Sequence, residues 1–269
     1  MLSLRTKYPA DTVEYSNGRV VCGTYNYDNG KRHGTLDLYD TDLVLLKQIE
    51  TDAILDTKWN NSLICTASSD GIQVFDADLN LLSKVSTGLC LSIDCQAQLT
   101  ASSMMDGSVE IYDDLKHLQT IKPHYSEVWT CHLGSLLYSG SDQGKLSCFD
   151  LTSNREICKH DFDAGVCSTI EKENYLYVGS YTDRIDVFDR RNWKVIHSID
   201  VGGGVWRMKF NENKLAVAAM YAGLMVYENH NLVHHFTDHE SMVYGVTWMP
   251  DDSLVSCSFY DCSIRKRFL

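Results

Sequence analysis

The chain has 269 residues, of which 44% are hydrophobic, so it is long enough to bury a large core in one or two domains. Its formal net charge of −12 argues against nucleic acid or an anionic membrane as the main partner, because both attract basic surfaces. Ten cysteines without a CxxC pair favour a reduced, cytoplasmic protein over a secreted disulfide scaffold.

The sequence shows no feature of a membrane protein or of a multidomain protein. Its first residues lack an apolar stretch long enough for a signal peptide, and no later apolar run is long enough to cross a bilayer. Three prolines and no low-complexity tract leave no obvious linker. We therefore expect one domain, residues 1–269, and a monomer with no membrane or nucleic-acid partner.

One segment type recurs throughout the chain. In chain order its copies read TLDLYD, GIQVFD, SVEIYD, KLSCFD, RIDVFD, GLMVYE and SIRKRF, and successive copies are 36 to 39 residues apart. A strand-like run that ends in a Ser, Gly or Asp turn precedes most copies, as in YSGSD and SCSFYD. Short alternating runs bounded by turn residues are typical of strands, and helical periodicity is weak. The sequence therefore predicts an all-β fold built from seven repeats.

The period and pattern of these repeats resemble those of the WD-repeat family, whose repeats form the four-stranded blades of a β-propeller. The resemblance covers nearly the whole chain, although Phe-Asp or Tyr-Asp replaces the Trp-Asp that ends the family's repeat. Seven repeats imply a seven-bladed propeller. The last repeat lacks an outer strand, so we expect residues 2–8, LSLRTKY, to complete the last blade and close the ring.

In a propeller, the innermost strand of each blade lines a central channel, and ligands commonly bind at its mouth. We expect these strands to be the runs TVEYS, ILDTKW, LCLSI, EVWTC, GVCST, GVWRM and MVYGV. An alignment on the first aliphatic residues gives a rim of Glu14, Asp56, Cys90, Trp129, Cys167, Trp206 and Tyr244. Acidic and aromatic side chains together favour a cation, especially a quaternary ammonium group, which each aromatic face attracts by about 0.5–2 kcal/mol. The alternative is that the aromatic side chains plug the channel and the carboxylates are solvated.

The connection before the sixth inner strand, VGGGVWR, contains three adjacent glycines. It fits neither a dinucleotide-binding fingerprint nor a Walker loop, because Arg207 stands at the sixth fingerprint position and no Lys-Ser or Lys-Thr pair follows. Glycines at the mouth would let the backbone or a ligand approach closely. Gly203 and Gly204 are therefore predicted to contribute to substrate binding.

Two repeats each contain a histidine, a serine and an aspartate at matched positions. These residues are His124, Ser139 and Asp142 in one repeat and His239, Ser256 and Asp261 in the other. The set resembles a hydrolytic triad, but a catalytic site is needed only once. The repetition favours a buried hydrogen-bond network that stabilises the blades.

Several longer phrases are more specific than the repeat, among them ADTVEYS, HYSEVW, YSGSDQG, GSYTDRIDVFDRRN, GGGVWR, MVYGVTW and CSFYD. In this order they resemble the WD-repeat diphthine methyl ester hydrolases of diphthamide biosynthesis, once called diphthine methyltransferases. The resemblance implies an enzyme that removes a methyl ester from a modified histidine of translation elongation factor two and releases methanol. It also implies a substrate side chain with a trimethylammonium group, for which Trp129, Trp206 and Tyr244 are the predicted contacts.

The sequence does not identify the hydrolytic group. Cys167 or Ser168 could attack the ester, Asp56 or Glu14 could activate water, and Arg207 could stabilise the oxyanion. The chain has no nucleophile-elbow motif, HExxH or paired metal-ligand spacing, so we expect neither a cofactor nor a metal. The alternative function is a non-catalytic WD-repeat scaffold for protein–protein interactions, the commoner role of such propellers.

Overall fold

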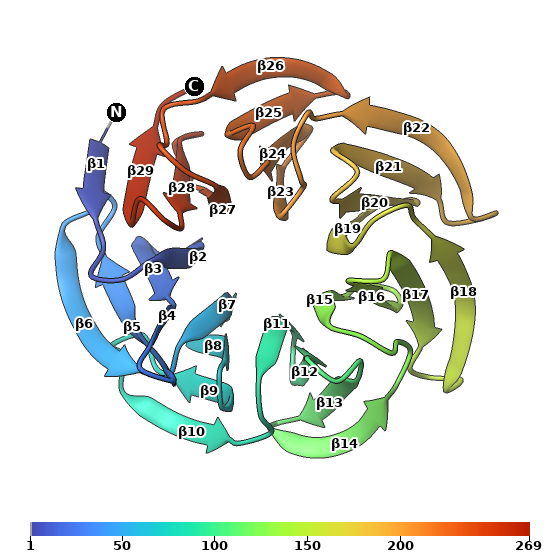
Figure 1. Cartoon of the computed structure of the whole chain (residues 1–269), viewed down its shortest axis with the longest axis horizontal. Coiled ribbons are helices and arrows are strands. Elements are labelled where there is room, and N and C mark those ends of the chain that lie inside the picture. Colours follow the sequence, from blue (N-terminus) through green and yellow to red (C-terminus); the bar gives the residue numbers. More distant parts are fainter. Residues whose placement is uncertain (1) are drawn as a thin grey trace.

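Seven antiparallel sheets are arranged as blades around a common axis (Figure 1). This computed structural model describes residues 2–269, and over that range it contains strands and turns but no helix. Within the described range there is accordingly no helix that could span a membrane. The prediction of an all-β, seven-bladed propeller is confirmed.

Each blade has an inner strand, two middle strands and an outer strand. Blade 1 contains β2 (Ala10–Ser16), β3 (Arg19–Thr24), β5 (Lys31–Tyr39) and β6 (Leu45–Thr51), extended by the short β4 (Asn26–Asp28). Blade 2 contains β7 (Ile54–Asn60), β8 (Leu63–Ser68), β9 (Gly71–Phe75) and β10 (Leu81–Val85). Blade 3 contains β11 (Cys90–Gln96), β12 (Leu99–Met104), β13 (Val109–Asp113) and β14 (Lys116–Ile121).

The remaining blades follow the same order. Blade 4 contains β15 (Val128–Leu133), β16 (Leu137–Ser141), β17 (Lys145–Asp150) and β18 (Arg155–Asp161). Blade 5 contains β19 (Val166–Lys172), β20 (Tyr175–Ser180), β21 (Arg184–Asp189) and β22 (Lys194–Asp200). Blade 6 contains β23 (Arg207–Asn211), β24 (Lys214–Ala218), β25 (Leu224–Glu228) and β26 (Asn231–Phe236). Blade 7 contains β27 (Val243–Trp248), β28 (Leu254–Ser258), β29 (Ser263–Arg267) and β1 (Leu2–Arg5).

The N-terminal strand closes the ring, as the repeat count predicts. Strand β1 pairs antiparallel with β29, from Leu2 opposite Lys266 to Arg5 opposite Ser263. The N- and C-terminal ends of the chain therefore lie side by side at blade 7 (Figure 1). This pairing covers the strand edge that β29 would otherwise present to solvent.

The core lies between neighbouring blades, where each sheet packs on the next. One cluster, for example, joins Val20 and Cys22 of blade 1 to Val255 and Ile264 of blade 7. Glycines in the second strands allow this close approach. A Cβ atom on Gly179 would lie 2.3 Å from Cγ1 of Val205, which belongs to the next blade.

The repeated histidines belong to buried polar contacts, as predicted. The Nε2 atom of His239 lies 2.8 Å from Oγ of Ser256, and its Nδ1 atom lies 2.9 Å from Oγ of Ser263. The Nε2 atom of His124 lies 2.8 Å from Oγ of Ser139. Burial lowers the pKa of each imidazole to about 4, so both are neutral at pH 7. Among the described residues Asp142 forms no hydrogen bond with His124, and it accepts one from a tryptophan, described below.

Deletion of residues 1–5 tests the closure. We expect it to lower the free energy of unfolding in urea by roughly 2–4 kcal/mol, because β29 loses its ladder partner at about 1 kcal/mol per hydrogen bond. Light scattering should also show self-association through the uncovered edge. Deletion of residues 268–269, which are exposed and follow β29, is the control. Equal stability of the two truncated proteins would contradict a structural role for β1.

The serine at the centre of the blade 7 network provides a second test. Ser256→Ala removes the partner of both His239 and Nη1 of Arg267, which lies 2.6 Å from the serine oxygen. We expect a loss of about 1–3 kcal/mol in urea unfolding, because buried polar groups lose a hydrogen-bond partner. Ser62→Ala, at an exposed turn, should leave stability within about 0.5 kcal/mol of wild type. A Ser256→Ala protein as stable as this control would show that the network contributes nothing.

Candidate functional site

A backbone bulge near the start of the inner strands shapes one end of the channel. In blade 4, for example, the β15–β16 register shifts between Val128 and Thr130, so that Trp129 is the extra residue. The same shift occurs in every blade except blade 6. In blade 6, Trp206 directly precedes β23 and donates its backbone N–H to the carbonyl of Ala218 at 2.9 Å. Such bulges redirect a side chain, and here the residues at this position in blades 4, 6 and 7 contact one another.

Seven residues, one from each blade, occupy this position and are called the mouth residues. They are Asp11, Leu55, Leu91, Trp129, Cys167, Trp206 and Tyr244. The rim predicted from sequence is thus correctly placed in blades 4 to 7 and wrong in blades 1 to 3.

The three misplaced residues lie elsewhere because their strands begin at a different point. Glu14 lies three residues beyond Asp11 along β2, and Asp56 lies one residue beyond Leu55 along β7, so both carboxylates lie deeper in the channel. Cys90 is the first residue of β11, and its side chain packs in the hydrophobic core between blades 2 and 3.

The aromatic mouth residues contact one another across blades 4, 6 and 7. The ring centroids of Trp129 and Trp206 are 5.6 Å apart, and those of Trp206 and Tyr244 are stacked at 4.7 Å. The indole N–H of Trp129 donates to Asp142 at 2.9 Å. Trp206 is only 8% exposed, yet among the described residues its indole N–H has no acceptor. The structure therefore brings together the three aromatic residues predicted to contact a cation.

The glycines beside the mouth are required by packing within the chain. A Cβ atom on Gly203 would lie 2.4 Å from the carbonyl oxygen of Ala219, and one on Gly204 would lie 2.5 Å from Sδ of Met220. Gly202 adopts a φ of 75°, in the left-handed region. These contacts hold the connection against the β24–β25 turn. The substrate contact predicted for Gly203 and Gly204 stays a prediction.

A network of ion pairs lies directly below the aromatic cluster. Asp56 accepts hydrogen bonds from Nζ of Lys58 at 2.8 Å and from Oγ of Ser92 at 2.9 Å. Its carboxylate also lies 3.5 Å from Nη2 of Arg207. Although burial opposes ionisation, Arg207 and Lys58 hold the pKa of Asp56 well below its usual range. Asp56 is thus ionised and fully engaged.

Glu14 belongs to the same network. Its Oε1 atom lies 2.6 Å from Nζ of Lys209 and 3.5 Å from Nζ of Lys58. Its two lysine partners, together with residues of the neighbouring inner strands, line a cavity of about 130 Å³ on the axis. Asp56, Ser168 and Arg207 all face this cavity, so Arg207 points inward and is not turned away by strand alternation.

The two candidate nucleophiles differ in their surroundings. Cys167 is 1% exposed, and burial raises the pKa of its thiol to about 12. Its Sγ atom donates to the carbonyl of Gly165 at 3.4 Å. Ser168, the next residue, is buried and lines the cavity. Within the chain described, neither side chain forms a hydrogen bond with an imidazole that could accept its proton.

One mouth residue that the sequence analysis missed is an acid. Asp11 is the bulged residue of β2 and is 6% exposed. Burial raises its pKa to about 8, although the positive charge of Arg207 opposes the rise. The sequence would predict Asp11 at the mouth if Ala10, the small residue that starts the strand in ADTVEYS, were aligned with the first aliphatic residues of the other inner strands.

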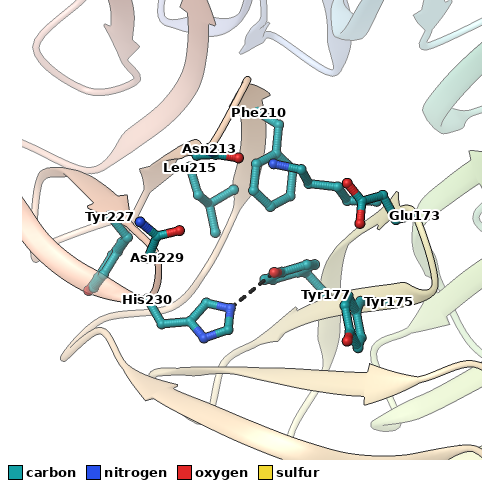
Figure 2. Close-up of a pocket in the computed structure, with 10 residues that line it drawn as sticks. Glu173, Tyr175, Tyr177, Phe210, Asn213, Leu215, Tyr227, Asn229 and His230 are labelled. Carbon is teal, nitrogen blue, oxygen red and sulfur yellow. Dashed lines mark hydrogen bonds between the residues drawn. The ribbon is translucent and has the colours of Figure 1, made fainter.

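A larger cavity, of about 270 Å³, lies at the opposite end of the inner strands of blades 5 and 6 (Figure 2). Tyr177, Phe210 and His230 line it, and the Tyr177 hydroxyl lies 3.0 Å from Nε2 of His230. None of the predicted site residues faces this cavity.

The described residues 2–269 contain no group of three or more His, Cys, Asp or Glu side chains placed to hold a metal ion. The side chains at and below the mouth supply aromatic faces, an inward guanidinium, paired carboxylates and one acid outside those pairs.

Comparisons with known proteins agree with this fold. Residues 230–266 match the family described as WD domain, G-beta repeat. A protein of Schizosaccharomyces pombe named diphthine methyltransferase is 35% identical, in an alignment that covers 95% of this chain and 93% of the relative. The diphthine methyltransferase homolog of Dictyostelium discoideum is 26% identical over 94% of this chain and 95% of its own. A chain in the crystal structure of the mitotic checkpoint complex has a TM-score of 0.85 at 16% identity, covering 98% of this chain and 90% of that one, which is a likeness of fold.

Proposed function

Because the chain belongs to the diphthine methyltransferase family, we propose that it hydrolyses the methyl ester of methylated diphthine on translation elongation factor two. The products are diphthine and methanol. Family membership indicates a role in diphthamide biosynthesis, and the ester hydrolysis is our more specific assignment within it. The substrate would be met in the cytoplasm, where elongation takes place.

One observation is the main support for this proposal: an aromatic cluster lies next to an inward-facing guanidinium group. Trp206 stacks on Tyr244 and lies beside Trp129, while Arg207 follows Trp206 in the chain and faces the cavity. Aromatic faces attract a trimethylammonium group, which cannot donate N–H hydrogen bonds. A buried guanidinium stabilises the oxyanion that forms when an ester carbonyl is attacked. The substrate side chain carries both groups, so one site can bind both.

The name of the relatives implies a methyl donor, such as a nucleoside-bearing sulfonium compound. The axial cavity of about 130 Å³ is lined largely by polar and charged side chains. Binding sites for small molecules and cofactors usually enclose about 300–1,000 Å³. The residues at the mouth do not fit such a donor, and we assign no step to one.

The rival function is a scaffold that binds proteins and carries out no reaction. Trp206 is almost fully buried and its indole N–H has no acceptor among the described residues, so this residue suits a ligand enclosed at the mouth better than a partner docked on an open face. The cavity below Trp206 is also large enough for several water molecules, so the channel beneath the aromatic cluster is not filled by side chains. Both observations favour a reaction site.

Mass spectrometry of elongation factor two carrying methylated diphthine tests the proposal. After incubation with the purified protein alone, the modified peptide should lose the mass of one methylene group as the methyl ester becomes an acid. The control is the same substrate without protein. An unchanged mass with retained binding would support the scaffold, and a gain of mass that requires a methyl donor would support methyl transfer.

The aromatic cluster can be tested by kinetics. Trp129→Leu and Trp206→Leu should each raise KM for the modified factor by about 2- to 30-fold, the loss expected when one aromatic face no longer attracts the cation. Turnover at saturation should change less. Trp193→Leu, at the β21–β22 turn away from the mouth, is the matched control. An unchanged KM in both mouth variants would rule out the aromatic cation site.

The cysteine beside the cluster can be tested separately. We expect Cys167→Ala to keep turnover within about threefold of wild type, because only the thiolate attacks and a thiol with a pKa of about 12 is protonated at neutral pH. Single-turnover measurements would check this. A loss of several orders of magnitude would instead identify Cys167 as the nucleophile.

A further inference from the structure

The carboxyl group of Asp11 differs from the other acids near the channel. Asp56 and Glu14 are held in ion pairs with lysine or arginine. Asp11 is similarly buried, but no described residue donates a hydrogen bond to its side chain. A buried carboxylate without donors is unfavourable, so the position is not explained by stability.

We propose that Asp11 is the general base that activates the hydrolytic water, an inference that rests on the proposed ester hydrolysis. Asp11 lies in the same layer as Trp206 and Tyr244, because all three are mouth residues. Arg207 lies one residue beyond Trp206, facing the axis. The charges of Asp11 and Arg207 interact, so a substrate whose cation contacts the aromatic rings would carry its ester close to both groups.

Five ionisable side chains surround Asp11, and none of them changes its charge near neutral pH. They are Cys22 on β3, Asp56 on β7, Arg207 on β23, Tyr244 on β27 and Cys257 on β28. Burial raises the pKa of the tyrosine and of both thiols, so these groups stay neutral. Asp56 stays ionised and Arg207 stays protonated. A base works best when its pKa is close to the working pH, as with the value of about 8 for Asp11.

The reaction balances with water as the only co-reactant. The Asp11 carboxylate takes one proton from water while the water oxygen bonds to the ester carbon, and Arg207 stabilises the oxyanion. The carbon–methoxy bond then breaks, and protonated Asp11 returns its proton to the leaving methoxide to form methanol. The new carboxylic acid loses its proton to solvent, and Asp11 is again a carboxylate.

Asp11→Asn keeps the size of the side chain and removes the base. We expect kcat to fall by about 10²- to 10⁴-fold, with KM for methylated diphthine on the factor changed less than about threefold. The matched control is Asp37→Asn, which replaces another buried acid of blade 1, on β5 and away from the mouth. That control should keep wild-type kcat.

The pH profile gives a second readout. The base must be deprotonated, so wild-type kcat/KM should rise with pH and level off above an apparent pKa near 8. The residual activity of Asp11→Asn should lack this step. A structural role for Asp11 would lower activity without removing the step.

Thermal stability provides a third readout that needs no substrate. Aspartate ionises near pH 4 in an unfolded chain, whereas burial keeps Asp11 protonated to about pH 8 in the folded protein. The folded state therefore loses stability as pH rises from about 4 to about 8. The Tm of Asp11→Asn should exceed that of wild type by an amount that grows over this range and then stays constant.

The outcomes separate this inference from the proposed function. If wild-type protein leaves the ester intact, the proposed function fails. If wild type hydrolyses it and Asp11→Asn does so with equal kcat, the proposed function stands and Asp11 is not the base. A raised KM with unchanged kcat would make Asp11 a partner of the substrate cation and would also overturn the inference.

Discussion

Charge compensation along the axis is the constraint on which the site depends. Seven inner strands converge there, and their ionisable side chains are removed from water, so each charge needs a partner. Asp56 satisfies this requirement for Lys58 and Arg207 together, and Glu14 does so for Lys209. The pairing fixes the guanidinium in place without any substrate. A donor held in advance needs no reorganisation when charge develops during a reaction.

The aromatic cluster and the ion-pair network are two layers of one arrangement. A bulge directs one residue of nearly every inner strand to the mouth, and the next residue faces the channel below. Trp206 and Arg207 show how adjacent residues can then serve different chemistry, one apolar and one charged. The two layers also differ in their acids. Asp11, in the mouth layer, has no ion-pair partner among the described residues, whereas Asp56, in the layer below, is paired with Lys58 and Arg207.

Much of this could be read from the sequence, because the repeat interval and the turn residues are local signals. Seven blades, closure by the N-terminal strand and the mouth positions of Trp129, Cys167, Trp206 and Tyr244 follow from them. The mouth residues predicted for the first three blades are wrong for a physical reason. Their inner strands begin with Ala10, Ile54 and Cys90, and the small or sulfur-containing first residue of blades 1 and 3 does not stand out as aliphatic. In blade 2 the bulged residue, Leu55, is itself aliphatic, so the sequence pattern predicts the following residue, Asp56, at the mouth. A bulge is a backbone feature that arises from one extra residue in a strand, and no residue type marks it.

The pairing of β1 with β29 also has a consequence for how the ring forms. Leu2 pairs with Lys266, so the strand pairing that closes the ring joins residues from nearly opposite ends of the sequence. During synthesis, β1 has no partner until nearly all of the described chain has emerged, and the nascent blades carry an open edge at both ends. Contacts between distant parts of a chain also form slowly, because the chain must lose the entropy of the whole loop first. Ring closure is therefore the late step of folding, and the interval before it is when the chain is most exposed to association with other chains.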